Sequence, residues 1–457
     1  MIVSFNPATE ETLASFEPHE GSAIESRLAA AHRAQRAWAA TALPDRLALL
    51  RRVAARLRDQ KASLGLTIAL EMGKPLVEAV GEVEKCAWNF DYYAEAAPAM
   101  LADEVVASSA SDSRIVRDPL GLVLAVMPWN YPLWQVMRAA APVLAAGNGL
   151  VLKHASNVPQ CALAIEAVFR DAGAPEGLVT TLLVGAAQVP ALIADERIAA
   201  VTFTGSTPAG RSIAAAAGQA LKKQVLELGG SDPFIVLADA DLETAAAVGV
   251  KARFQNTGQS CIAAKRFIVE QSVADRFVEA FCEQARRLVV GDPLAAGTTQ
   301  GAMARANLRD DLHAQVQASL NEGATLCLGG RPVPGRGVFY EPTVLDHVKP
   351  AMTAAREETF GPAAAIVRVR DAGEAVAVAN GTPFGLGAAL WTRDLDRART
   401  LARQVEAGAV FVNGLVASDP RLPFGGIKAS GYGRELGRLG LHEFTNAKTV
   451  WTGPART

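Results

Sequence analysis

A cysteine, Cys261, closes the short polar run NTGQSC at residues 256–261. A thiolate is a potent nucleophile, and the run lies between two predicted helices, where a helix N-terminus would stabilise its negative charge. The alternative is that Cys261 is a small buried apolar side chain, as most cysteines are. The other four cysteines lie in apolar helical or strand patterns and fit that alternative: Cys86, Cys161, Cys282 and Cys327.

A glutamate, Glu227, interrupts the apolar run VLELGG at residues 225–230, which is typical of a strand that ends in two glycines. A carboxylate in such a strand is costly unless it is paired or its pKa is raised. A raised pKa would suit a general base that removes a proton from a thiol or a water molecule. The alternative is an edge strand that turns Glu227 toward solvent.

Two further motifs follow predicted strands. MPWNYP at 127–132 holds Asn130 between two prolines, so its amide could donate into a cleft, or the motif could be only a rigid turn. FTGSTPAG at 203–210 places Gly205 and Ser206 between a strand and a helix, where free N–H groups could bind a phosphate. This motif is not the GxGxxG pattern, so a plain turn is its alternative.

Apolar periodicity predicts the elements that must position these residues. The first hundred residues have helical periodicity, with helices at 25–40 and 45–60. From Arg114 onward short strands alternate with helices, which indicates two α/β domains with parallel sheets covered on both faces, divided near Gly229. The predicted strands are 122–127, 149–153, 200–203, 224–228, 233–237, 364–369, 387–391 and 409–412, and the helices are 133–146, 159–172, 206–218, 242–255 and 273–289.

Composition narrows the class of protein. A chain of 457 residues is too long for one ordinary core, and its net charge of −2 without a basic stripe argues against a nucleic-acid partner. No apolar run approaches the length of a membrane helix, and the N-terminus does not read as a signal sequence. Five dispersed cysteines without a CxxC pair suggest neither disulfides nor a metal site, which predicts a cytoplasmic protein.

Together the motifs resemble those of the aldehyde dehydrogenase superfamily. GQSC, LELGG, MPWNYP and FTGS are joined by EETFGP at 357–362, FVNG at 411–414 and PFGG at 423–426, in the family's order. Glu227 and Cys261 are 34 positions apart, as the family pattern expects. The resemblance begins at Asn6 and covers essentially the whole chain.

The resemblance implies a fold and an assembly. It places a Rossmann-like NAD(P)-binding domain at 1–98 and 119–229, an α/β catalytic domain at 230–432, and a small β oligomerisation arm at 99–118 and 433–457. Arg114–Arg117 and a strand at 448–451 would belong to that arm. An isolated arm could not bury its apolar side chains, which predicts a homodimer or homotetramer.

The resemblance also implies a reaction. Cys261 would attack an aldehyde, Asn130 and the Cys261 N–H would stabilise the oxyanion, and Glu227 would activate the water that hydrolyses the thioester. NAD or NADP would be the cofactor. Ser156 stands where NAD-preferring members often carry glutamate, so nothing there would repel a 2′-phosphate. The other implied cofactor-binding residues are Trp129, Lys153, Gly205, Ser206, Glu358 and Phe360.

Arg138 indicates a substrate. It lies where succinate-semialdehyde dehydrogenases carry an arginine for the substrate's carboxylate, although it could instead be a helix-surface residue. Ser418 and Arg421 are further candidates, while Gln255 stands where many of those enzymes have a second arginine. The predicted reaction is therefore NAD(P)-dependent oxidation of succinate semialdehyde to succinate.

Three alternatives stay open. The first is another aldehyde, such as glutamate semialdehyde or an aliphatic one. The second is a CoA-acylating relative, which usually lacks the glutamate seen here as Glu227. The third is a non-catalytic structural relative, against which the intact trio of Cys261, Glu227 and Asn130 argues.

Overall fold

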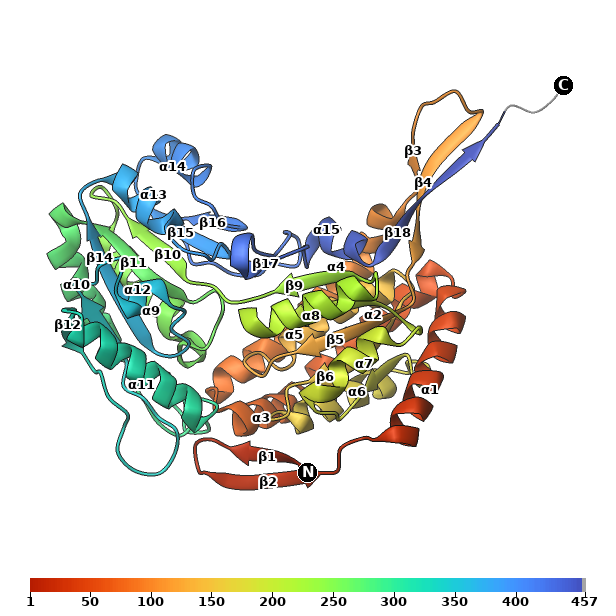
Figure 1. The fold of residues 1–457 in the computed structure, drawn as a ribbon, viewed down its shortest axis with the longest axis horizontal. Helices are drawn as coiled ribbons and strands as arrows, with labels where there is room; N and C mark the ends of the chain where they lie inside the picture. The colour runs from red at the N-terminus through yellow and green to blue at the C-terminus, as the bar shows by residue number, and fades with distance from the viewer. Residues whose placement is uncertain (454–457) are drawn as a thin grey trace.

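The computed structural model describes residues 1–453, so residues 454–457 of the predicted arm lie outside the described part. Two mainly parallel sheets dominate the molecule, one in each half of Figure 1, and helices cover them. The predicted α/β fold class is confirmed. None of the described helices combines the length and the apolar character needed to cross a membrane.

The first sheet has six strands in the order β17-β9-β8-β5-β6-β7, and every neighbouring pair is parallel except β17 with β9. Its central strands β5 and β6 are buried along their whole length, as is typical of strands that begin with apolar runs. The strands are β5 (Leu122–Met127), β6 (Gly149–His154), β7 (Val179–Thr181), β8 (Ile198–Thr204), β9 (Lys223–Glu227) and β17 (Gly431–Tyr432).

Helices pack on both faces of this sheet. One face carries α1 (Gly21–Ala39), α7 (Val189–Ala194) and α8 (Thr207–Gln219). The other face carries α2 (Leu43–Asp59), α3 (Lys61–Met72), α4 (Leu76–Leu101), α5 (Trp134–Ala145) and α6 (Pro159–Asp171). The long helix α4 contacts α5, and the two together form one wall of the site described below.

The second sheet has seven strands in the order β12-β13-β14-β11-β10-β15-β16, parallel except for β12 with β13. The strands are β10 (Asp232–Val236), β11 (Ala264–Glu270), β12 (Thr325–Leu328), β13 (Thr343–Asp346), β14 (Ala363–Val369), β15 (Gly387–Trp391) and β16 (Ala409–Val412). Helices α9 (Leu242–Phe254) and α10 (Gln271–Ala285) cover one face. The other face is covered by α11 (Ala306–Asn321), α12 (Thr353–Arg356), α13 (Ala372–Asn380) and α14 (Leu395–Ala402).

Strand β11 corrects the sequence interpretation. Cys261 is followed by a turn and then by this central strand, so no helix N-terminus lies behind the thiol. The strand was missed because Lys265 and Arg266 break its apolar pattern. Both side chains are nonetheless buried, because each donates hydrogen bonds to several backbone carbonyls.

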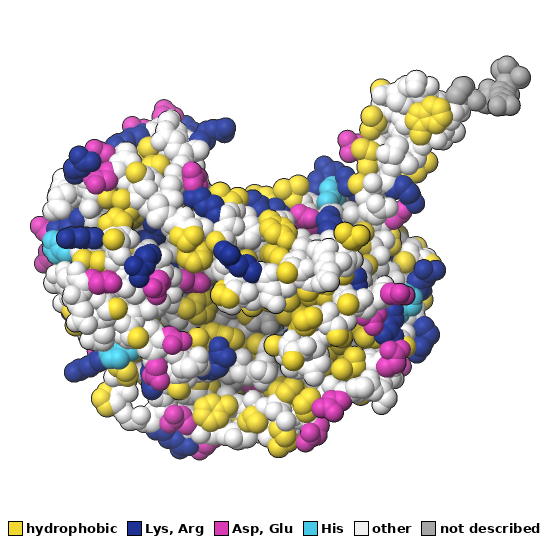
Figure 2. All heavy atoms as spheres, in the orientation of Figure 1, with side chains coloured by type: hydrophobic (Ala, Val, Ile, Leu, Met, Phe, Trp, Pro, Cys, Tyr) yellow, Lys and Arg dark blue, Asp and Glu magenta, His cyan; other side chains and the backbone are white. Residues whose placement is uncertain are grey.

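A three-stranded arm projects from the body in Figure 1, in the order β18-β4-β3. It consists of β3 (Glu104–Val105), β4 (Asp112–Pro119) and β18 (Thr445–Thr452). Apolar side chains are exposed on the arm (Figure 2), including Val450 at 41% and Trp451 at 54%. The remaining elements are the hairpin β1 (Ile2–Asn6) and β2 (Glu11–Phe16), the helix α15 (Gly437–Glu443), and three short 3-10 helices, η1 (Ala186–Gln188), η2 (Gln255–Gly258) and η3 (Lys428–Ser430).

Candidate active site

The loop that carries Cys261 has an unusual backbone. Asn256 and Thr257 both adopt left-handed conformations, with φ of 55° and 56°. Gly258 follows with φ of +71°, and a Cβ there would lie 2.4 Å from the carbonyl oxygen of Gly361. Left-handed non-glycine residues cost about 1–3 kcal/mol each, so the surrounding structure must hold this loop in place.

Buried polar groups supply that support. The Asn256 side chain donates to the Asn130 carbonyl at 2.8 Å, and its backbone N–H donates to Glu78 Oε2 at 2.8 Å. Fully buried Arg253, on α9, donates to the carbonyls of Gly258 at 3.2 Å and Thr359 at 3.3 Å. The loop is therefore fixed to both halves of the molecule.

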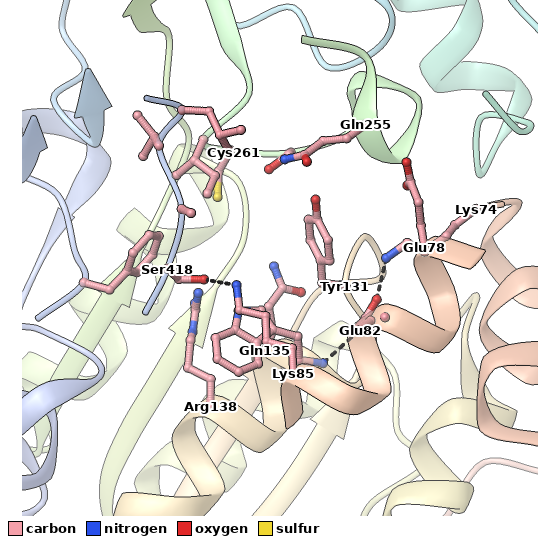
Figure 3. A pocket seen from close by; sticks show the side chains of 18 of the residues that line it. Lys74, Glu78, Glu82, Lys85, Tyr131, Gln135, Arg138, Gln255, Cys261 and Ser418 are labelled. Atoms are coloured by element: carbon pink, nitrogen blue, oxygen red, sulfur yellow. Dashed lines mark hydrogen bonds and ion pairs between the residues drawn. The ribbon is translucent and has the colours of Figure 1, made fainter. Parts of the chain in front are cut away.

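Cys261 lies between two cavities. The larger, of about 490 Å³, lies against α4 and α5 (Figure 3), and the smaller, of about 240 Å³, lies at the carboxyl ends of β5 and β8. Cys261 and Gln135 line both of them. A nucleophile at such a junction could receive an aldehyde from one side and a second reactant from the other.

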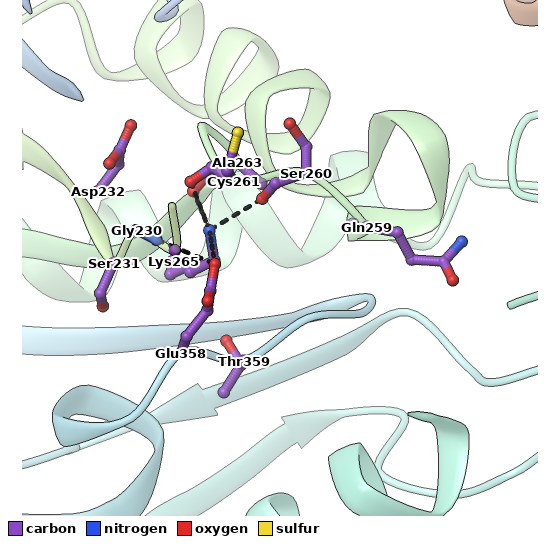
Figure 4. Close-up of polar contacts among 12 residues, drawn as sticks. Gly230, Ser231, Asp232, Gln259, Ser260, Cys261, Ala263, Lys265, Glu358 and Thr359 are labelled. Carbon is purple, nitrogen blue, oxygen red and sulfur yellow. Dashed lines mark hydrogen bonds and ion pairs between the residues drawn. The ribbon is translucent and has the colours of Figure 1, made fainter. Parts of the chain in front are cut away.

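Burial raises the pKa of the Cys261 thiol to about 12, which favours the protonated thiol over the thiolate. Among the groups that lower this pKa, Lys265 has the largest effect. Its ammonium donates to the carbonyls of Ser260 at 2.9 Å and Cys261 at 2.8 Å (Figure 4). Lys265 also lies 3.7 Å from Glu358 Oε1. Its charge favours the thiolate and its hydrogen bonds fix the turn. The pattern AKRFIVE at 264–270, a charged pair inside an otherwise apolar run, was the signal that could have revealed it.

Asn130 is buried, and its amide is oriented by neighbours. Its Oδ1 accepts a hydrogen bond from Gln135 at 3.0 Å, while its Nδ2 donates to the Gln259 carbonyl at 3.0 Å. One of the two Nδ2 protons is thereby left for another acceptor. Asn130 lines the smaller cavity together with Cys261, so that proton is available beside the thiol. Gln135 was not singled out from the sequence.

Glu227 lies at the end of β9, only 1% exposed, which excludes the solvent-facing alternative. Neither carboxylate oxygen has a hydrogen-bond partner among the described residues, and burial raises its pKa well above the ordinary value. The side chain lies against Gly425, where a Cβ would come within 2.7 Å of Oε1. Glu227 lines neither cavity.

A second buried carboxyl group, Glu435, also raises the pKa of Glu227. Glu435 forms an ion pair with Arg138 and accepts a hydrogen bond from Thr202 at 3.3 Å. Arg138 is 3% exposed by its side chain, so the helix-surface interpretation of this residue is wrong. It also donates to Thr204 Oγ1 at 3.2 Å and stacks over the Phe424 ring at 4.9 Å. The predicted substrate clamp is thus already paired with a carboxylate of its own chain.

The smaller cavity brings together five of the predicted cofactor residues: Trp129, Gly205, Ser206, Glu358 and Phe360. Trp129 packs edge-on against Phe360 with ring centroids 5.8 Å apart. Ser206 caps α8 without a side-chain hydrogen bond, so the first N–H groups of this helix lack that partner. An apolar slot beside such a helix N-terminus fits a nicotinamide dinucleotide. Arg305 and Leu308 also line this cavity and were not predicted.

Lys153 and Ser156 do not line this cavity. Lys153 lies at the end of β6, beside β5, so it shares a sheet edge with Trp129, and carboxyl ends of parallel strands are where dinucleotides bind. It is 8% exposed, and burial alone lowers its pKa. Ser156 is exposed in the loop that follows. The chemistry of both fits the adenosine end of a cofactor, with no acidic side chain at Ser156.

The larger cavity contains three of the four predicted substrate residues: Arg138, Gln255 and Ser418. Arg421 lies outside it. Its exposed guanidinium pairs with Asp419 at 2.6 Å and lies over the Trp88 ring, because the loop turns this side chain toward the surface.

The sequence analysis also did not identify the charged residues on α4 that line this cavity. Glu78, Glu82 and Lys85 on α4 all line it, at the i, i+4 and i+7 spacing that places residues on one helix face. Lys85 Nζ donates to Ser418 Oγ at 2.7 Å (Figure 3) and lies over the Trp134 ring at 4.4 Å. The helical spacing of these three charged residues was the available signal.

Cys261 is thus a half-buried cysteine at the junction of two α/β units, between a cavity beside a helix N-terminus and a cavity lined by charged side chains. A model of the aldehyde dehydrogenase family matches residues 1–450, and the chain belongs to that family. It is 50% identical to the probable succinate-semialdehyde dehydrogenase [NADP(+)] of Synechocystis sp., over 98% of this chain and 99% of the relative. It is also 50% identical to the succinate semialdehyde dehydrogenase [NAD(P)+] of Escherichia coli, over 98% of this chain and 97% of that one.

A solved structure agrees over the whole length. The succinic semialdehyde dehydrogenase of Streptococcus pyogenes, crystallised with NADP+, superimposes with a TM-score of 0.97 at 37% identity. The match covers 99% of this chain and 100% of the other.

Proposed function

We propose that this aldehyde dehydrogenase oxidises succinate semialdehyde to succinate with NAD or NADP. The observation that carries the proposal is the larger cavity, which opens at Cys261 and is lined by Lys85, a cation that no carboxylate of residues 1–453 contacts within 4 Å. A cavity with this charge suits an aldehyde that carries a distal carboxylate. The names of the relatives support the same substrate and both cofactors.

Each residue has a chemical role in this proposal. Cys261, once deprotonated, attacks the aldehyde carbon, and the oxyanion formed receives hydrogen bonds from Asn130 Nδ2 and the Cys261 N–H. The bound cofactor supplies a hydride acceptor. The acyl group is then a thioester on Cys261, and Glu227 takes a proton from the water that attacks it. Release of the carboxylate regenerates the thiol.

The charged end of the substrate gives the first test. Succinate semialdehyde and butyraldehyde have the same number of carbons, and only the former has a carboxylate. A charge-assisted hydrogen bond contributes about 1.5–3 kcal/mol, so kcat/KM should favour succinate semialdehyde by about 10- to 150-fold. The measurement is the absorbance of reduced cofactor with each aldehyde and with NAD and NADP in turn. Equal values, or a preference for glutamate semialdehyde, would reject this substrate.

The proposal includes an assembly. Residues 99–118 and 433–457 would form an oligomerisation arm, while 1–98 with 119–229 would bind the cofactor and 230–432 would carry the nucleophile. Support comes from the projecting arm, whose Val450 and Trp451 are exposed. Exposed apolar side chains on a thin arm favour burial against a second copy.

Sedimentation tests the assembly. The native chain should sediment as a homodimer or homotetramer at micromolar concentration. Replacing Val450 and Trp451 together by lysine should shift it toward the monomer, while the same change at the exposed body residue Leu221 should not. A native chain that sediments as a stable monomer would contradict the prediction.

A further inference from the structure

The cations around the larger cavity differ in whether a carboxylate of the protein already neutralises them. Lys74 forms a buried ion pair with Glu82, and Arg138 forms one with Glu435. Lys85 has no carboxylate within 4 Å among residues 1–453, and its ammonium donates to the Ser418 hydroxyl. Among the described residues, the half-buried Lys85 is therefore a cation inside this cavity that no carboxylate contacts directly.

The ammonium of Lys85 is also held in position. Its Nζ donates to Ser418 at 2.7 Å and lies 4.4 Å from the Trp134 ring centroid, so both a polar and an aromatic contact restrict it. An ammonium has three protons, and Ser418 accepts one of them. The others are available to an acceptor in the cavity that Lys85 shares with Cys261.

We infer that Lys85, with the Ser418 hydroxyl beside it, binds the distal carboxylate of the aldehyde substrate and determines the preference for it. This rests on the proposed function and names the recognising group within it. Arg138 then acts as a positioning residue, since it compensates Glu435 and packs on Phe424.

The titration of Lys85 gives a readout that a merely structural residue would not give. Burial is the main cause that lowers its pKa to about 8. Arg138 on α5 lowers it further, whereas Cys86 and Glu82 on α4 and Asp419 in the loop after β16 raise it. A lowered pKa means that the ammonium is lost as the pH rises through about 8. The substrate carboxylate stays ionised over that range, so the attraction should weaken between about pH 7 and pH 9.

The experiment compares kcat/KM for succinate semialdehyde and for butyraldehyde, and follows the ratio of the two values. Lys85→Met should lower the ratio by about 10- to 150-fold, mainly through KM for succinate semialdehyde. Lys85→Arg should restore most of the ratio. In the native protein the ratio should fall between about pH 7 and pH 9, and Lys85→Arg should abolish that fall because a guanidinium stays charged.

Two further variants serve as controls. Lys251→Met removes an exposed cation at the rim of the same cavity and should change the ratio by less than about twofold, since a rim charge is screened by water. Arg138→Met should lower the thermal unfolding midpoint and slow both aldehydes, because it leaves Glu435 buried without its cation.

The outcomes separate this inference from the proposed function. A native protein without preference for succinate semialdehyde would overturn the proposed function itself. A native preference that Lys85→Met leaves intact would overturn only the role of Lys85. The role of Lys85 would also be overturned if Lys251→Met lowered the ratio as much as Lys85→Met does. It would likewise be overturned if Arg138→Met removed the preference for succinate semialdehyde while leaving the turnover of butyraldehyde unchanged.

Discussion

Replacing Cys261 by alanine is expected to lower kcat by roughly 10³-fold or more, because the thiol is the only group proposed to form a bond with the aldehyde. No other cysteine can substitute for it. Cys86, Cys161 and Cys282 are buried within hydrophobic cores, and none of these, nor Cys327, lines either cavity. The measurement is kcat with succinate semialdehyde under saturating cofactor.

Cofactor binding is the control for this variant. The thiol is one of many groups that line the smaller cavity, and Lys153 lies outside that cavity, so affinity for NAD or NADP should change little. Fluorescence titration with the reduced cofactor would show this. Cys261→Ser should be nearly as inactive, because a hydroxyl is far less acidic than a thiol. An alanine variant that kept more than a few per cent of native kcat would rule out covalent catalysis at this position.

Glu227→Gln should separate the two halves of the reaction. If Glu227 activates the hydrolytic water, the variant should form the thioester and then stall, with turnover reduced by about 10²- to 10⁴-fold. Rapid mixing should show a burst of reduced cofactor close to one equivalent per site, followed by slow release. The amide has the same shape, and the buried carboxylate makes no hydrogen bond with residues 1–453 that the variant would lose.

The pH dependence gives the matching control. Burial and the neighbouring Glu435 raise the pKa of Glu227, so the fraction that is ionised, and able to act as a base, increases as the pH rises through that pKa. Native turnover should increase with pH accordingly, and the residual turnover of Glu227→Gln should not follow this profile. Unchanged steady-state turnover in the variant would remove Glu227 from the mechanism.

Local sequence patterns were sufficient for most of the two sheets. Strands β5 and β6 were predicted within one residue, because strands buried on both faces consist mainly of apolar residues. Strand β11 was missed because Lys265 and Arg266 resemble a surface segment. Their burial depends on carbonyls from elsewhere, such as Ser231 and Val378, which no local pattern encodes.

The residues of the candidate site likewise fall into those that local motifs indicate and those whose contacts depend on the tertiary fold. Asn130, Gly205 and Cys261 lie in short motifs whose turn chemistry can be recognised locally. Arg138 was recognised by position, but its pairing with Glu435 joins segments almost three hundred residues apart. The contact of Lys85 with Ser418 spans 333 residues. Such pairings require the tertiary fold, so the charge balance of the larger cavity could not be predicted from the sequence.

The pairing of β17 with β9 affects the order in which parts of the molecule can fold during synthesis. Gly431 lies opposite Glu227, so the strand that pairs with β9 at this residue emerges from the ribosome some two hundred residues later. Strand β18, which completes the arm, emerges later still. A nascent chain that has already folded most of its first sheet therefore keeps the strand edge at Glu227 open, and such edges favour misassociation. Strand β17, which pairs with β9 at Glu227, and strand β18 of the arm can therefore both join their partners only after most of the first sheet has been synthesised.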